Sequence, residues 1–147
     1  MGRITLTHAA FDKDVPREYS EYYLLYMLEA VCRANMKWLE LYPNTPPLYK
    51  SGVYYVEEDG TEEWPDIPTL YRNGKGDCED LACARVAELR MKGIRCRPFI
   101  RWRSHSNGSR TYHVLVAIRH PRGTTFIGNE RFVIEDPSKR LGMNGED

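Results

Sequence analysis

Neither sign of charge dominates this chain of 147 residues, because Lys and Arg together number 21 and Asp and Glu together also number 21. A balanced charge creates no overall field that would steer the protein toward nucleic acid, an anionic membrane surface or acidic substrates. We therefore expect any partner to be recognised by a local site, and nucleic acid is not the expected partner.

Long apolar runs are also missing. No stretch approaches the roughly 20 apolar residues that cross a bilayer. Residues 1–8 lack the apolar core of a signal peptide, and Leu6 stands where a myristoylation signal has Ser or Thr. These absences predict a cytoplasmic chain that has no signal peptide and no membrane partner.

Cysteine is scarce and irregularly spaced, with four residues and no C-x2-C pair. A zinc site built from Cys78, Cys83, Cys96 and a histidine is therefore not favoured. Without a secretory signal the expected state is four reduced thiols. Cys32, Cys83 and Cys96 are expected to be structural.

The length suits one domain, and we expect residues 1–147 to fold as a single unit. Within it, residues 1–63 form an N-terminal helical part and residues 64–141 form the core. Apolar residues recur at three- and four-residue steps over residues 17–42, which predicts a helix that ends at Pro43.

The second half of the chain predicts an α+β fold. Prolines and glycines over residues 64–76 predict an ordered loop, and residues 78–91 predict a helix that Gly93 caps. An antiparallel sheet should pack against this central helix, which carries Cys78 at its N-terminus. The expected strands are 53–56, a short one, and then 94–103, 112–118 and 131–135.

Arginines gather on one face of the strand expected at residues 94–103. The simplest interpretation is a solvated sheet face, and the alternative is a surface beside a cleft that holds an acidic peptide or nucleic acid. The residues are Arg95, Arg97, Arg101 and Arg103, joined by Arg110 from the following segment.

Cys78 is placed for chemistry by its neighbours. Asp77 suits a helix N-cap and Asp80, three residues later, completes a capping box, so Cys78 should be the first helical residue. The positive end of the helix dipole favours thiolate and lowers the thiol pKa. We expect Cys78 to be a nucleophile, and the alternative is a buried structural thiol.

A cysteine nucleophile needs a base, and the base needs an acceptor that orients it. His113 begins a buried strand and Asp136 ends a neighbouring one, so both could meet the tip of the helix. We expect Asp136 to fix the tautomer of His113. The alternatives are His105 and His120 as the base and Glu135 as the acceptor.

An oxyanion hole would need two donors. The backbone N–H of Cys78 is one candidate, and the other donor should come from the upstream loop. The candidates there are Trp64, Tyr71 and Asn73, which the sequence does not rank.

Three segments together resemble the transglutaminase-like superfamily, which has a papain-like core and the order Cys, His, Asp. They are Gly76–Ala82, Tyr112–Val114 and Asp136–Pro137, and the resemblance covers residues 64 to 141. It implies a cysteine hydrolase, a protease or amidase, that forms an acyl-enzyme with a protein or peptide substrate. If an amine resolved the acyl-enzyme, the reaction would be that of a transglutaminase.

The residues around Cys78 are particularly similar to those of bacterial transglutaminase-like cysteine proteinases, some of which bind calcium. This similarity implies calcium ligation by Asp77, Glu79 and Asp80, and no other cofactor is expected. The alternative is that these acids only stabilise the helix N-terminus. The acids also oppose thiolate formation, and a bound cation would relieve that conflict.

The segment Asp136–Met143 is similar to small transglutaminase-like proteins encoded in bacteriophage genomes. This similarity implies a phage origin and an association with the virion. It also supplies an alternative to the enzyme, namely a non-catalytic assembly protein that binds phage or virion structural proteins with the same fold.

Overall fold

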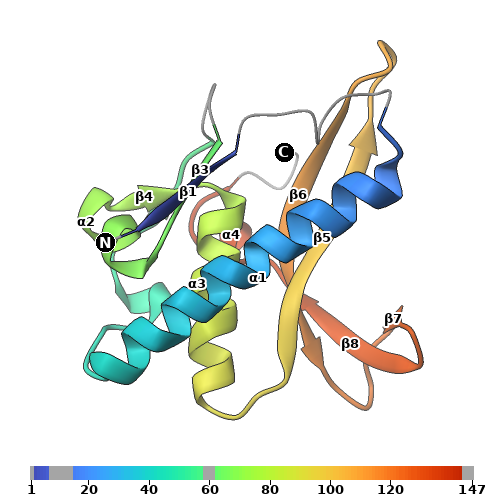
Figure 1. Ribbon diagram of the computed structural model, residues 1–147. Coiled ribbons are helices and arrows are strands. Elements are labelled where there is room, and N and C mark those ends of the chain that lie inside the picture. The colour runs from blue at the N-terminus through green and yellow to red at the C-terminus, as the bar shows by residue number, and fades with distance from the viewer. Residues whose placement is uncertain (1, 7–14, 58–61, 144–147) are drawn as a thin grey trace.

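The structure is a computed structural model that describes residues 2–6, 15–57 and 62–143 (Figure 1). Helices and antiparallel strands both contribute, which confirms the predicted α+β class. The elements are β1 (Arg3–Leu6), α1 (Arg17–Leu41), the 3-10 helix η2 (Leu48–Lys50), β2 (Tyr54–Tyr55), β3 (Glu62–Pro65), α2 (Ile67–Asn73), β4 (Lys75–Gly76), α3 (Cys78–Met91), β5 (Cys96–Ser104), β6 (Arg110–Arg119), β7 (Thr125–Ile127), β8 (Glu130–Glu135) and α4 (Pro137–Arg140).

The main sheet has the strand order β5-β6-β8-β7, and every neighbouring pair is antiparallel. Strands β5 and β6 form a long hairpin whose register runs from Cys96 opposite Ile118 to Ser104 opposite Arg110. The middle of β6 is buried on both faces, as its apolar sequence predicts. Only the short strand β7 was not expected in this sheet.

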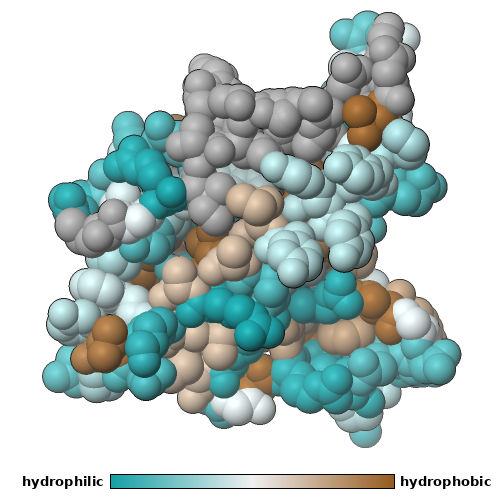
Figure 2. All heavy atoms as spheres, viewed as in Figure 1, coloured by the Kyte–Doolittle hydropathy of each residue, from teal (hydrophilic) through white to brown (hydrophobic). Residues whose placement is uncertain are grey.

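The principal core lies between α1, α3 and the sheet. Leu28 of α1, Val86 of α3 and Val116 of β6 are completely buried and belong to one cluster that also contains Cys78. Followed along the chain in Figure 1, α1 crosses first β5 and then α3. The outward side of α1 is mostly pale to teal in Figure 2, as expected for an amphipathic helix that buries one stripe.

The segment 64–76 is not the loop that the sequence predicted. It contains the end of β3, the helix α2 and the strand β4. Asp66 caps α2 by accepting a hydrogen bond from the Thr69 amide at 3.1 Å, and Gly74 ends it with a φ of 74°. A proline in the first turn is compatible with a helix, so this proline marked a helix start and not a loop.

Two small sheets join this segment to the N-terminal half of the chain. Strand β1 pairs with β3, and β2 pairs with β4 in parallel. The part of residues 1–63 that the structure describes is therefore not only helical. No helix among the described residues is long and apolar enough to cross a membrane.

Candidate active site

Helix α3 begins at Cys78, as the sequence predicts. The capping box is present: Asp77 accepts a hydrogen bond from the Cys78 amide at 2.7 Å, and the Asp80 carboxylate accepts one from the Asp77 amide at 3.0 Å. The Cys78 amide was expected to serve an oxyanion hole. In this structure it instead donates to the neighbouring carboxylate.

The pairing of β6 with β8 ends before the strand β6 does, which leaves one β6 amide without a β8 partner. The His120 amide donates to the Arg131 carbonyl, and every second pair from there is hydrogen-bonded, down to Val116 opposite Glu135. The next bonded pair would place a β6 residue opposite Pro137. Pro137 begins α4 instead, so one β6 amide has no strand residue opposite it.

That amide belongs to Val114, and it donates to the Sγ of Cys78 at 3.5 Å. The thiol therefore takes the position that the next residue of β8 would have taken. Val114 follows His113 directly in β6, so the amide that binds the thiol belongs to the residue next to the predicted base.

His113 and Asp136 are in direct contact. The Nε2 of His113 lies 3.0 Å from the Oδ2 of Asp136, and the two side chains are 25% and 15% exposed. Burial alone would raise the pKa of Asp136, but the hydrogen bond and charge of His113 outweigh it and hold that pKa below its usual value. This bond leaves Nδ1 of the imidazole for a second partner.

The alternative residues have other roles. His105 lies in the exposed turn of the β5–β6 hairpin, where its ring contacts Thr111 at 3.0 Å, and His120 is exposed. Glu135 binds the Arg85 guanidinium at 2.6 Å on the side of α3. The structure therefore brings Asp136, and not Glu135, to His113.

The surroundings of the Cys78 thiol favour its protonated form. It is 6% exposed and donates a hydrogen bond to Glu79 Oε2 at 3.2 Å. Burial raises the pKa of the Cys78 thiol well above its usual value, and the charges of Glu79 and Asp77 raise it further. The prediction of a lowered pKa is wrong, because burial and two carboxylates outweigh the helix dipole.

The predicted triad is only partly assembled in this state. Within the described part of the chain, the hydrogen bonds of the Cys78 thiol run to Glu79 and to the Val114 amide, and none runs to the His113 ring. His113 and Asp136 are paired, and Cys78 lies beside the strand that carries His113.

Replacing Glu79 by glutamine should accelerate alkylation of Cys78 at pH 7.5 by roughly threefold to tenfold. The change removes the negative charge next to the thiol, so the thiol pKa falls and the thiolate fraction grows. Labelling with iodoacetamide followed by peptide mass mapping gives the rate at Cys78 separately from the other cysteines.

The matched control for this experiment is Glu40→Gln, which removes one exposed carboxylate from α1. It should leave the rate unchanged. Equal rates for Glu79→Gln and the wild type would show that Glu79 does not hold the thiol in its protonated form.

The three candidates for the second oxyanion donor lie in different surroundings. Trp64 is buried in the same cluster as Cys78. The Tyr71 hydroxyl donates to the Pro46 carbonyl at 2.9 Å, and Asn73 is exposed at the end of α2. Trp64 is thus the candidate that shares the surroundings of the thiol.

The residues around Cys78 also form a group of metal-ligand types. One donor atom each of Asp77, Cys78 and Glu79 lies within 4.8 Å of the others, whereas Asp80 is not part of the group. Calcium takes six to eight oxygen ligands, and this group supplies two carboxylates and a sulfur. These side chains alone do not complete a calcium site, so calcium binding stays a prediction.

Sequence reasoning missed two contacts of the thiol. The first is the hydrogen bond from Cys78 to its neighbour Glu79. The second is the hydrogen bond from the Val114 amide, which has no β8 partner because β8 has already ended. The sequence did contain one signal for the second contact, since Pro137 cannot continue a central strand.

Comparison with known protein families identifies a relationship. The family model described as the transglutaminase-like superfamily matches residues 47–133, which is more than half of the chain. The matched region contains Cys78 and His113 and ends shortly before Asp136. No curated protein and no solved structure matches the chain.

Proposed function

Since the chain belongs to the transglutaminase-like superfamily, we propose that it is a cysteine hydrolase that cleaves a carboxamide or peptide bond. One observation carries the proposal. The imidazole of His113 is oriented by Asp136 at 3.0 Å, and the next amide along the strand donates to the Cys78 thiol. The proposed nucleophile and base thus come from α3 and β6, and the proposed orienting acceptor is the residue that follows β8.

In the proposed reaction, His113 takes the proton of the Cys78 thiol as sulfur attacks the substrate carbonyl. The carbonyl π electrons move to oxygen and then return, and the C–N bond breaks while His113 gives the proton to the leaving nitrogen. The products of this stage are an amine and a thioester on Cys78. Water, deprotonated by His113, then releases a carboxylic acid and restores the thiol.

Asp136 is proposed to orient the base. Because its carboxylate accepts the Nε2–H of His113, the lone pair of Nδ1 remains for the thiol proton. The lowered pKa of Asp136 keeps this carboxylate ionised at neutral pH, so it stabilises the imidazolium that forms during attack.

Glu79 opposes this reaction in the resting state. The thiol must give up its hydrogen bond to Glu79 before it can donate to His113. Because burial and two carboxylates raise the pKa of Cys78, we propose that the proton leaves during the attack. The proposed mechanism is therefore general base catalysis, without a preformed pair of thiolate and imidazolium.

The same thioester could react with an amine, which would make the protein an acyl transferase. Hydrolysis is the proposed outcome, and access of water or amine to the thioester decides between the two. Adding a primary amine to the assay below separates them by the mass of the released product.

Burial of the thiol and its raised pKa favour a second candidate function. In this case the chain would be a binding protein with the same fold and an inactive thiol. Phage or virion structural proteins are the proposed partners, following the similarity of residues 136–143 to phage-encoded proteins.

The enzyme proposal is tested without knowledge of the substrate by using p-nitrophenyl acetate, an activated ester. We expect an acetyl group on Cys78, detected by intact mass and peptide mapping, and continued release of p-nitrophenol as water restores the thiol. Parallel samples with calcium chloride and with EDTA test the calcium prediction.

Two variants serve as controls. Cys78→Ala should remove the acetylated peptide, whereas Cys83→Ala, which changes a completely buried cysteine of the same helix, should retain it if the variant remains folded by circular dichroism. An equal rate of p-nitrophenol release by Cys78→Ala and the wild type would contradict the enzyme proposal and favour the binding protein.

A further inference from the structure

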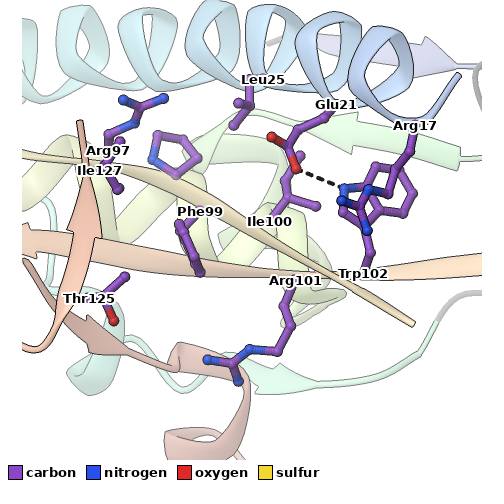
Figure 3. A pocket seen from close by; sticks show the side chains of 11 residues that line it. Arg17, Glu21, Leu25, Arg97, Phe99, Ile100, Arg101, Trp102, Thr125 and Ile127 are labelled. Carbon is purple, nitrogen blue, oxygen red and sulfur yellow. Dashed lines mark hydrogen bonds between the residues drawn. The ribbon is translucent and has the colours of Figure 1, made fainter. Parts of the chain in front are cut away.

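A groove with a volume of about 460 Å³ lies between α1, β5 and β7 (Figure 3). Clefts that bind ligands usually measure roughly 300–1,000 Å³, so this one has room for a short stretch of chain. Its walls are formed by Arg17, Glu21, Leu25, Arg97, Pro98, Phe99, Ile100, Arg101, Trp102, Thr125 and Ile127.

Strand β5 is an edge of the main sheet, and its hydrogen bonds show which of its backbone groups face outward. The Arg119 amide donates to the Arg95 carbonyl at 2.9 Å, and the His105 amide donates to the Ser109 carbonyl at 2.8 Å. Both bonds belong to odd-numbered residues on the β5 side. Hydrogen-bonded and non-bonded residue pairs alternate along an antiparallel pair of strands. The backbone amides and carbonyls of odd-numbered β5 residues therefore bond to β6, and those of even-numbered residues point away from β6.

Two even-numbered residues of β5, Ile100 and Trp102, line the groove and have backbone groups on the outer edge of the sheet. The carbonyl of Cys96 points outward as expected, since it accepts a hydrogen bond from Arg90 at 3.1 Å. Pro98 has no amide, a common feature of edge strands. Within the described ranges, no strand pairs with the outer edge at Ile100 and Trp102. These two residues can therefore bond to an added strand.

The groove carries an excess of positive charge. Arg17, Arg97 and Arg101 line it and are exposed, and none of them forms a salt bridge with another described residue. Glu21 is the acid in the lining, and it is engaged by the Trp102 indole N–H at 2.8 Å, as the dashed line in Figure 3 shows.

The two sides of the β5 edge differ in polarity. Odd residues such as Arg97 and Arg101 lie on one face, and Ile100 and Trp102 lie on the other, toward α1. A strand added to this edge would place alternate side chains near arginine and near apolar surface, which Leu25 continues on α1.

The groove also adjoins the candidate active site. In the register of β5 and β6, Arg101 lies directly opposite His113, so their side chains are neighbours on the same face. A peptide held at the β5 edge is therefore bound beside the strand that carries the proposed base.

We propose that an acidic peptide in extended conformation binds this groove by adding a strand to the outer edge of β5. Its acidic side chains pair with Arg97 and Arg101, and its alternate apolar side chains lie against Trp102 and Leu25. Nucleic acid offers the same negative charge, but its sugar-phosphate backbone lacks the alternating donors and acceptors that Ile100 and Trp102 match. The inference goes beyond the proposed hydrolase, since it concerns peptide binding and needs no chemistry at Cys78.

The first test measures binding by fluorescence anisotropy with the Cys78→Ala protein, which prevents turnover. The probe is a short fluorescein-labelled peptide that alternates Glu and Val, compared with a Lys and Val peptide and with oligothymidine of equal charge. We expect binding of the acidic peptide alone. Arg97→Ala and Arg101→Ala should each weaken it about tenfold, the loss of one charge-assisted hydrogen bond. Arg122→Ala, an exposed arginine outside the groove, is the matched control and should have no effect.

The second test identifies the backbone contact. Amide hydrogen exchange should slow at Ile100 and Trp102 when the acidic peptide binds, while the Phe99 and Arg101 amides, already bonded to β6, should not change. Equal binding of oligothymidine, or unchanged exchange at Ile100 and Trp102, would overturn the proposal. Because the protein in both tests lacks the thiol, these outcomes are independent of whether the enzyme proposal fails.

Discussion

The His113→Ala variant is expected to acylate Cys78 with p-nitrophenyl acetate about two to four orders of magnitude more slowly than the wild type. Without the imidazole, no positioned base takes the thiol proton, and the raised pKa of Cys78 leaves almost no thiolate at pH 7. The measurement is the rate of acetyl addition to the Cys78 peptide, followed by mass spectrometry.

His105→Ala is the matched control, because this histidine lies in the exposed hairpin turn. It should react as the wild type does. Asp136→Asn should give an intermediate loss, since the base remains but its tautomer is no longer fixed by a carboxylate. If His113→Ala acylated at the rate of the wild type, His113 would not be the base.

The largest expected loss of stability concerns the ion pair between β8 and α3. Glu135→Ala should lower the free energy of unfolding by about 2–3 kcal/mol, because the largely buried guanidinium of Arg85 loses its contact with Glu135 and keeps Glu88, at 2.9 Å, as its carboxylate partner. The side chains of Glu135 and Arg85 are 19% and 17% exposed, and the pair also involves the Tyr49 hydroxyl at 2.7 Å from Glu135. Urea denaturation at pH 7 measures this change.

The control lies at the start of the same strand. Glu130 pairs with Arg119 in an exposed site, where ion pairs contribute about 0–1 kcal/mol, so Glu130→Ala should cost little. Equal losses for Glu130→Ala and Glu135→Ala would show that burial of the Arg85 pair does not matter.

The pH dependence has a definite sign. Burial alone would raise the pKa of Glu135, but its hydrogen bonds from Arg85 and Tyr49 lower it below the usual value. The carboxylate therefore contributes its full stability above its unfolded pKa, and the contribution is lost as the pH falls through the lower folded pKa. The difference between wild type and Glu135→Ala should accordingly shrink in acid.

The bounds of a helix could be predicted from the sequence where neighbouring residues determine its start and its end. Helix α3 begins at Cys78 and ends at Met91 as predicted, because a capping box marks its start and a glycine follows its end. Helix α2 was missed, although Asp66 and Gly74 cap it, because the prolines and glycines of residues 64–76 suggested a loop.

The candidate site was only partly predictable. The contact between His113 and Asp136 follows from the ends of two neighbouring strands, which the sequence located. The protonation of Cys78 does not follow, because it depends on how deeply the thiol is buried and on where Glu79 points. Burial is a property of the packed molecule, and reasoning from the helix dipole alone gave the wrong direction for the pKa shift of Cys78.

The position of Pro137 has a consequence for how such a site can arise. The amide of Val114 could donate a hydrogen bond either to the next residue of β8 or to the Cys78 thiol. It donates to Cys78, because β8 ends before it reaches Val114. Proline has no amide proton to return to the ladder and fixes the turn into α4. A side chain from a helix can thus bind a backbone amide of a sheet strand where the neighbouring strand ends one bonded residue pair early.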